Sequence, residues 1–160
     1  MDQSLYFIIA RTLHVVGVVL WIGGVAFVTT VLIPSLKKIA DPDNRLDLFE
    51  QLERQFAFQA RIVVLITGIT GYYMLDFLQA WDRYQHLTYW WMHLMTFIWV
   101  IFALVLFALE PLFLHRWFRE QAITNSENAF NWLHRMHKLL LTLSIVSILG
   151  AVAGSHGYQW

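Results

Sequence analysis

The chain has 160 residues, of which 58% are hydrophobic and only 14% are charged, against about 45–50% and about 25% in ordinary soluble domains. This composition excludes an ordinary water-soluble domain and favours a membrane protein whose main partner is the lipid bilayer. The 11 basic and 11 acidic residues give a formal net charge of zero, so we expect no nucleic acid partner. Cysteine is absent, which excludes disulfides and thiolate metal sites.

Four apolar stretches are long enough for a membrane-spanning helix, which needs about 20 residues. In chain order, the predicted spans cover about residues 5–33, 56–78, 89–109 and 133–154. The first ends at Pro34, and the third ends where Glu110-Pro111 interrupts the apolar pattern. We therefore expect an all-α integral membrane protein, an up-down-up-down four-helix bundle forming a single domain over residues 1–160.

The polar connections between the spans predict the orientation. Residues 44–55 repeat apolar side chains at helical spacing, which is typical of an amphipathic helix at the membrane interface. Lysine and arginine gather in the first and third connections, whereas Arg11 and Arg83 stand on the opposite side. By the positive-inside rule, we expect a bacterial inner-membrane protein with both termini periplasmic. Tryptophans in the third span are expected to contact lipid or, alternatively, a second copy in a homodimer.

Two histidines lie inside the predicted spans. His14 follows about one turn after the start of the first apolar core, and His93 follows about one turn after the start of the third. Such a group inside a membrane is costly and usually functional. Since helices one and three run parallel in this bundle, both imidazoles are expected at one depth, as a pair of axial ligands for haem b. The alternative is that each histidine only joins two helices by a hydrogen bond.

The helix face around His14 supports a cofactor. Gly17, Trp21 and Gly24 fall on the face of His14, and small residues there leave room for the edge of a porphyrin. Arg11, one turn outward, is placed to reach the interface and pair with haem propionates. Close helix packing alone is the alternative reason for the glycines and the tryptophan.

Further polar residues are candidates for binding. His115, His134 and His137 cluster on the inner side, and His137, beside an apolar run, is the best of them for a second haem or a metal ion. His156 lies at the outer end of the fourth span. We expect it to replace His14 or His93 as a ligand, to contact the edge of the cofactor or to lie in a solvated C-terminal tail. Arg61, inside the second span, is a further candidate cofactor contact, or else it reaches lipid headgroups.

Copper is the alternative to haem. Met92, His93 and Met95 offer thioether and imidazole ligands of the kind that Cu(I) prefers. Met92 and Met95 share one helix face from which His93 is offset, so the three do not converge ideally on one ion.

The segment LHVVGVVLWIGGVAFVTTVLIP resembles the first helix of the CopD-like membrane-protein superfamily, through Leu13, His14, Trp21, Gly23, Gly24 and Pro34. RIVVLITGITGYYML is similar to that family's second helix, with Arg61 and Gly68 in place. The resemblance covers most of the chain. It implies copper uptake or resistance or, through the related HemJ-like proteins, which also carry a histidine in helix one, haem binding and protoporphyrinogen oxidase activity.

The residues and the resemblance together predict a membrane-bound b-type haem protein with one haem or two. We expect it to transfer electrons, as an oxidoreductase linked to quinol or to a periplasmic acceptor, because two imidazole ligands leave no open position on iron. Three alternatives remain at this point: CopD-type copper transport or tolerance, a HemJ-like enzyme, and a structural membrane protein without a cofactor.

Overall fold

The computed structural model describes residues 3–157, and over that range the chain is helical, with short connections and no strand. The first helix comprises α1 (Gln3–Phe27), a π-helical segment η1 (Val28–Leu32) and α2 (Ile33–Leu36). After α3 (Pro42–Phe77) come two short 3-10 turns, η2 (Trp81–Gln85) and η3 (Leu87–Tyr89). The remaining elements are α4 (Trp90–Leu104), the π-helical η4 (Val105–Leu114), α5 (His115–Thr124) and α6 (Ser126–Ser155). The all-α prediction is confirmed.

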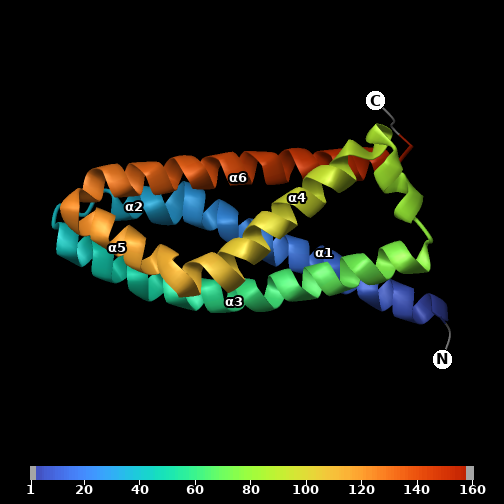
Figure 1. Cartoon of the computed structure of the whole chain (residues 1–160), viewed down its shortest axis with the longest axis horizontal. Helices are drawn as coiled ribbons and strands as arrows, with labels where there is room; N and C mark the ends of the chain where they lie inside the picture. Colours follow the sequence, from blue (N-terminus) through green and yellow to red (C-terminus); the bar gives the residue numbers. More distant parts are fainter. Residues whose placement is uncertain (1–2, 158–160) are drawn as a thin grey trace.

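Within the described residues, four helices are long and apolar enough to cross a membrane: Gln3–Leu36, Pro42–Phe77, Leu87–Thr124 and Ser126–Ser155. Each extends beyond the span predicted from its apolar run. Residues 44–55 form the first part of α3 and continue without a break into residues 56–77. Both ends of the described chain and residues 78–89 lie at one end of the molecule, called here the terminal end (Figure 1). Residues 37–41 and 125 lie at the other, the hairpin end.

Capping residues start the two helices that leave the hairpin end. Asp41 accepts a hydrogen bond from the Asp43 backbone N–H at 3.1 Å, and Pro42 occupies the first helical position of α3. Asn125 accepts in the same way from the Asn128 N–H at 3.0 Å. These side chains satisfy backbone donors that the first turn of a helix leaves unpaired.

The helices pack mainly in two pairs, α1 along α3 and α4 along α6. Small residues allow each close approach. A Cβ atom at Gly17 would lie 2.5 Å from Thr67 Oγ1, and one at Gly154 would collide with the indole ring of Trp91. Trp99 joins the pairs, because its Nε1–H donates to the Val64 carbonyl at 2.9 Å. In Figure 1, α4 accordingly runs obliquely from the end of α6 towards α3.

Two apolar cores fill the bundle. The middle core includes Trp21 and Val25 from α1, Val64 from α3 and Ile98 from α4. The hairpin-end core is built by the second half of the first helix, the start of α3, α5 and the start of α6. Its centre is a group of three rings, Phe49, Phe118 and Phe130, whose centroids lie 5.1 to 5.6 Å apart. Phe130 is fully buried.

Each π-helical segment is associated with a proline: Pro34 follows η1 by two residues, and Pro111 lies inside η4. In a π-helix, the N–H of each residue bonds to the carbonyl five residues earlier, as Ile33 does to Val28. The next donor would be Pro34, which has no N–H. The carbonyl of Thr29 is therefore free, and it accepts a hydrogen bond from His134 Nε2 at 2.9 Å.

Pro111 likewise leaves one backbone carbonyl of the third helix without an N–H donor. Its missing N–H would have bonded to the Leu106 carbonyl, and Arg61 Nε donates to that oxygen instead, at 2.9 Å. A side chain from another helix thus satisfies each of the two freed carbonyls. This is how the first and third helices continue past their prolines.

Candidate functional site

His14 lies half-buried between α1 and α3, inside the apolar part of the bundle. Its Nδ1 atom lies 3.0 Å from the Thr67 carbonyl oxygen and 3.2 Å from Thr70 Oγ1. The ring lies against Gly71, where an added Cβ would come within 3.1 Å of Cε1. The ring position is therefore set by one backbone oxygen, one hydroxyl and the absence of a side chain at residue 71.

These contacts fix the tautomer of the neutral imidazole. The Thr67 carbonyl can only accept a hydrogen bond. The Thr70 hydroxyl donates its own hydrogen to the Ile66 carbonyl at 2.6 Å, so it presents a lone pair to His14. Nδ1 therefore carries the hydrogen, and the lone pair of neutral His14 is on Nε2. A metal-binding histidine in proteins is usually held in this way, with its other ring nitrogen donating to a carbonyl.

The residues predicted to share a face with His14 each contact a different part of the structure. Gly17 is buried, and the Thr67 side chain fills the space beside it; Gly24 lies against the ring of Phe56. Trp21 is buried and meets Phe102 edge to face, at 5.0 Å between centroids. Its Nε1–H has no hydrogen-bond partner within the described part of the chain. Arg11 is exposed.

His93 is held by the connection between α3 and α4. Its Nδ1 lies 3.1 Å from the Tyr89 carbonyl and its Nε2 lies 3.0 Å from the Tyr84 carbonyl. The Tyr84 ring stacks edge-on against it, and the Tyr84 hydroxyl is bonded to Thr96 at 2.6 Å. Since a neutral imidazole carries one N–H, only one of the two carbonyls receives a hydrogen bond from neutral His93. Binding iron through Nε2 requires that nitrogen to exchange the Tyr84 oxygen for the metal.

The structure therefore places the two predicted ligands differently. His14 is on the α1–α3 pair, and its Nδ1 contacts leave the lone pair on Nε2. His93 lies in the first turn of α4, which packs on α6 through Trp91. As it stands, His93 does not meet the requirement for an axial ligand until its contact with Tyr84 opens.

The other histidines are dispersed. His137 and His156 each direct Nδ1 at the carbonyl four residues earlier, at 3.0 and 2.8 Å. His156 is exposed at the end of α6, whereas His137 is half-buried. His134 uses Nε2 to satisfy Thr29, and His115 Nε2 lies 3.9 Å from Glu50 Oε1. Over residues 3–157, no group of three or more histidine, aspartate or glutamate side chains is arranged to hold a metal ion.

The copper candidates surround His93 on α4. Met92 is buried and Met95 is half-buried. Both nitrogens of His93, the third member, already lie against carbonyls. Nothing in this arrangement favours copper over haem.

Arg61 joins α3 to the π-helical η4. Besides its bond to the Leu106 carbonyl, it forms an ion pair with Glu110. Glu53 lies close enough to this pair to interact electrostatically with Glu110, His115 and Arg61. The guanidinium group is thus engaged by protein groups on the opposite helix.

Sequence reasoning did not find Thr67 and Thr70, which contact His14 through the Thr67 backbone carbonyl and the Thr70 hydroxyl. Both stand in the segment TGIT, at a spacing of three that puts them on one helix face. Two hydroxyl residues on one face of an apolar helix, opposite a helix with a buried histidine, are the signal that was available.

Comparison with known proteins finds no family model that matches the chain, and no curated protein or solved structure that matches it at a significant level.

Proposed function

We propose that the chain is a membrane-bound b-type haem protein that transfers electrons, with His14 as the first axial ligand. The observation that carries the proposal is the hydrogen bonding of His14. Its Nδ1 donates to the Thr67 carbonyl, and its Nε2 keeps its lone pair inside an apolar bundle. An ionisable side chain at such a position is costly, so its presence argues for a use.

His93 is proposed as the second ligand. In the tautomer whose Nδ1–H donates to the Tyr89 carbonyl, the lone pair of Nε2 faces the Tyr84 oxygen, which is an unfavourable contact. Tyr84 belongs to a short 3-10 turn and not to a long helix. Freeing Nε2 would require that turn to move, with loss of the Tyr84 contacts to Thr96 and Trp81.

Two imidazole ligands leave no open coordination position, so the chemistry that a bound haem supplies here is one-electron transfer. The chain's own part is to orient the two rings. Thr67, Thr70 and Gly71 perform this task for His14. The proposed electron donor is a membrane quinol, and the proposed acceptor lies on the side of the terminal end.

Absorption spectroscopy tests the proposal. The full chain, produced with adequate haem supply and purified in mild detergent, should show the bands of six-coordinate low-spin haem, with about one haem per chain. His14→Ala should abolish these bands, and His93→Ala should convert them to a high-spin form. His86→Ala, which removes an exposed imidazole from the same end of the molecule, is the matched control.

The outcomes separate the alternatives. A full low-spin spectrum in both variants would exclude this ligand pair. A colourless protein that retains copper would favour the transport function instead. Reduction of the purified haem protein by a short-chain quinol, measured by stopped-flow absorption, would support quinol as the donor, and reduction by dithionite alone would exclude it.

We also propose that the four long helices cross the bacterial inner membrane alternately, with both termini periplasmic. Basic residues in or next to the first and third polar connections support this orientation, among them Lys37, Lys38, Arg45, Arg54, Arg116, Arg119, Arg135 and Lys138. Because the chain has no cysteine, single cysteines report topology without background. Gln79→Cys should react with an impermeant maleimide in intact spheroplasts, and Asp43→Cys should react only after lysis. The reverse result would invert the orientation.

A further inference from the structure

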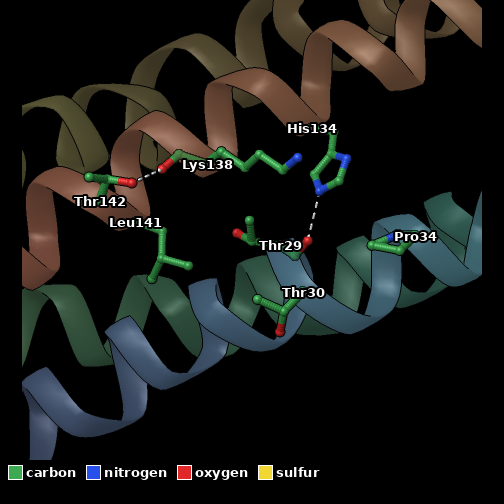
Figure 2. A pocket seen from close by; sticks show the side chains of 7 residues that line it. All are labelled: Thr29, Thr30, Pro34, His134, Lys138, Leu141 and Thr142. Carbon is green, nitrogen blue, oxygen red and sulfur yellow. Dashed lines mark hydrogen bonds between the residues drawn. The ribbon is translucent and has the colours of Figure 1, made fainter.

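A groove lies between the first helix and α6, next to the proline of the first helix. It has a volume of about 460 Å³ and is lined by Thr30 and Pro34 on one side and by His134, Lys138 and Leu141 on the other. Figure 2 shows Lys138 and His134 reaching from α6 into the same space, above Thr29. None of the proposed haem ligands contributes to this groove.

The π-helical segment fixes one wall. Because Pro34 leaves the Thr29 carbonyl free, His134 Nε2–H donates to it at 2.9 Å. Nδ1 of His134 is the ring's remaining nitrogen. The hydroxyl of Thr30 donates to the Ala26 carbonyl at 2.8 Å. The groove wall is therefore ordered before anything binds, which reduces the entropy lost on binding.

The charge on the groove is positive and unopposed. Lys138 forms no ion pair within residues 3–157, and the residues that line the groove include no carboxylate. Because His134 donates its Nε2–H to Thr29, the Nδ1 of the neutral ring presents a lone pair, and Lys138 is the positively charged group that lines the groove. Lys37 is turned towards Asn131, to which its ammonium donates at 2.5 Å. A lysine ammonium without a carboxylate partner favours a bound anion.

The surroundings of the groove are apolar. Towards the terminal end, Ile145 follows Leu141 one turn along α6 and is exposed. On the first helix, Gly23 stands two turns from Thr30 on the same face, and nothing lies within 4 Å of the position its Cβ would take. A ligand with an anionic head and a hydrocarbon chain therefore matches the positively charged groove and the apolar helix surfaces beside it.

We propose that the groove binds one anionic phospholipid, with its phosphate at Lys138 and one acyl chain along the Gly23 and Ile145 surfaces. The positive charge selects the head, and the apolar helix faces select a lipid over a free anion. Basic pockets between membrane helices bind anionic lipid heads in this general manner.

Native mass spectrometry of the full chain, purified in neutral detergent, tests the site without any requirement for haem. Added phosphatidylglycerol should be retained as one lipid per chain, whereas phosphatidylcholine should not. Lys138→Gln should weaken retention about fivefold, as expected for one basic group near a lipid head. Arg54→Gln, which removes an exposed charge on α3, should leave retention unchanged. Leu141→Trp, which keeps the charge but fills the groove, should also weaken it.

Three results would overturn the proposal. The first is equal loss of lipid in the Lys138→Gln and Arg54→Gln variants. The second is equal retention of phosphatidylcholine. The third is displacement of phosphatidylglycerol by inorganic phosphate at equal concentration, which would show that the groove recognises the phosphate group alone.

Discussion

Replacement of Arg61 by methionine tests how the third helix passes Pro111. The substitution keeps an apolar chain of similar length and removes two interactions. One is the Nε–H bond to the Leu106 carbonyl, at 2.9 Å, and the other is the ion pair with Glu110. The carbonyl and the carboxylate would both remain in place without partners.

The expected loss follows from burial. A buried carbonyl without a donor costs about 1–3 kcal/mol, and breaking one side of a buried ion pair costs about 3–5 kcal/mol. The Arg61 side chain is 32% exposed and that of Glu110 is 19% exposed. Both values place the cost at the lower end, and the terms share one side chain. We therefore expect Arg61→Met to lower the free energy of unfolding by about 3 kcal/mol.

A second substitution isolates the carbonyl. In Pro111→Ala, a backbone N–H is restored, and the Leu106 carbonyl regains a donor within its own helix. Arg61→Met should then cost about 1–2 kcal/mol less than in the original chain. Unfolding in mixed detergent and dodecyl sulfate, followed by circular dichroism, gives the four free energies of the double-mutant cycle. Arg54→Met, at an exposed site on the same helix, is the control. Additive costs would refute the role assigned to Arg61 at Pro111.

Three further substitutions probe the helix contacts. Gly71→Ala puts a Cβ 3.1 Å from Cε1 of His14, so the ring must shift, and haem affinity measured by titration should fall about tenfold. Gly154→Val collides with the Trp91 ring and should destabilise the chain by about 1–3 kcal/mol in the same unfolding assay. In Gly23→Val, the new Cβ meets nothing within 4 Å, and stability should change by less than about 0.5 kcal/mol, so a large loss there would contradict the packing described.

The four helices were predictable because their apolar runs are long, and a membrane-spanning helix needs only length and composition to be recognised. The residues at which these helices end were not predictable from the sequence. Pro34 and Glu110-Pro111 were interpreted as the ends of spans, yet the first and third helices continue beyond both. The donors that make this possible, His134 and Arg61, lie far away in the sequence. A local pattern carries no information about such distant partners.

The candidate site was predictable to a similar degree. His14 stood out because it is an ionisable residue in an apolar run, and the structure places its Nδ1 against the Thr67 carbonyl of the neighbouring helix. The equal depth of His14 and His93 was inferred from spacing alone. The contact of His93 with Tyr84 depends on the fold of a short connecting turn, which the sequence does not determine. The pairing of Thr67 with His14 required knowledge of which helix faces meet.

The length of the helices has a consequence for the hairpin end. A helix of 36 residues, such as α3, measures about 54 Å, whereas the hydrocarbon layer is about 30 Å thick. Even when tilted, about three turns of it would stand clear of the lipid. The side chains of Phe49, Phe118 and Phe130 pack together in the hairpin-end core and hold these turns in place. The order of this part of α3 would therefore come from its packing against α5 and α6 and not from the lipid.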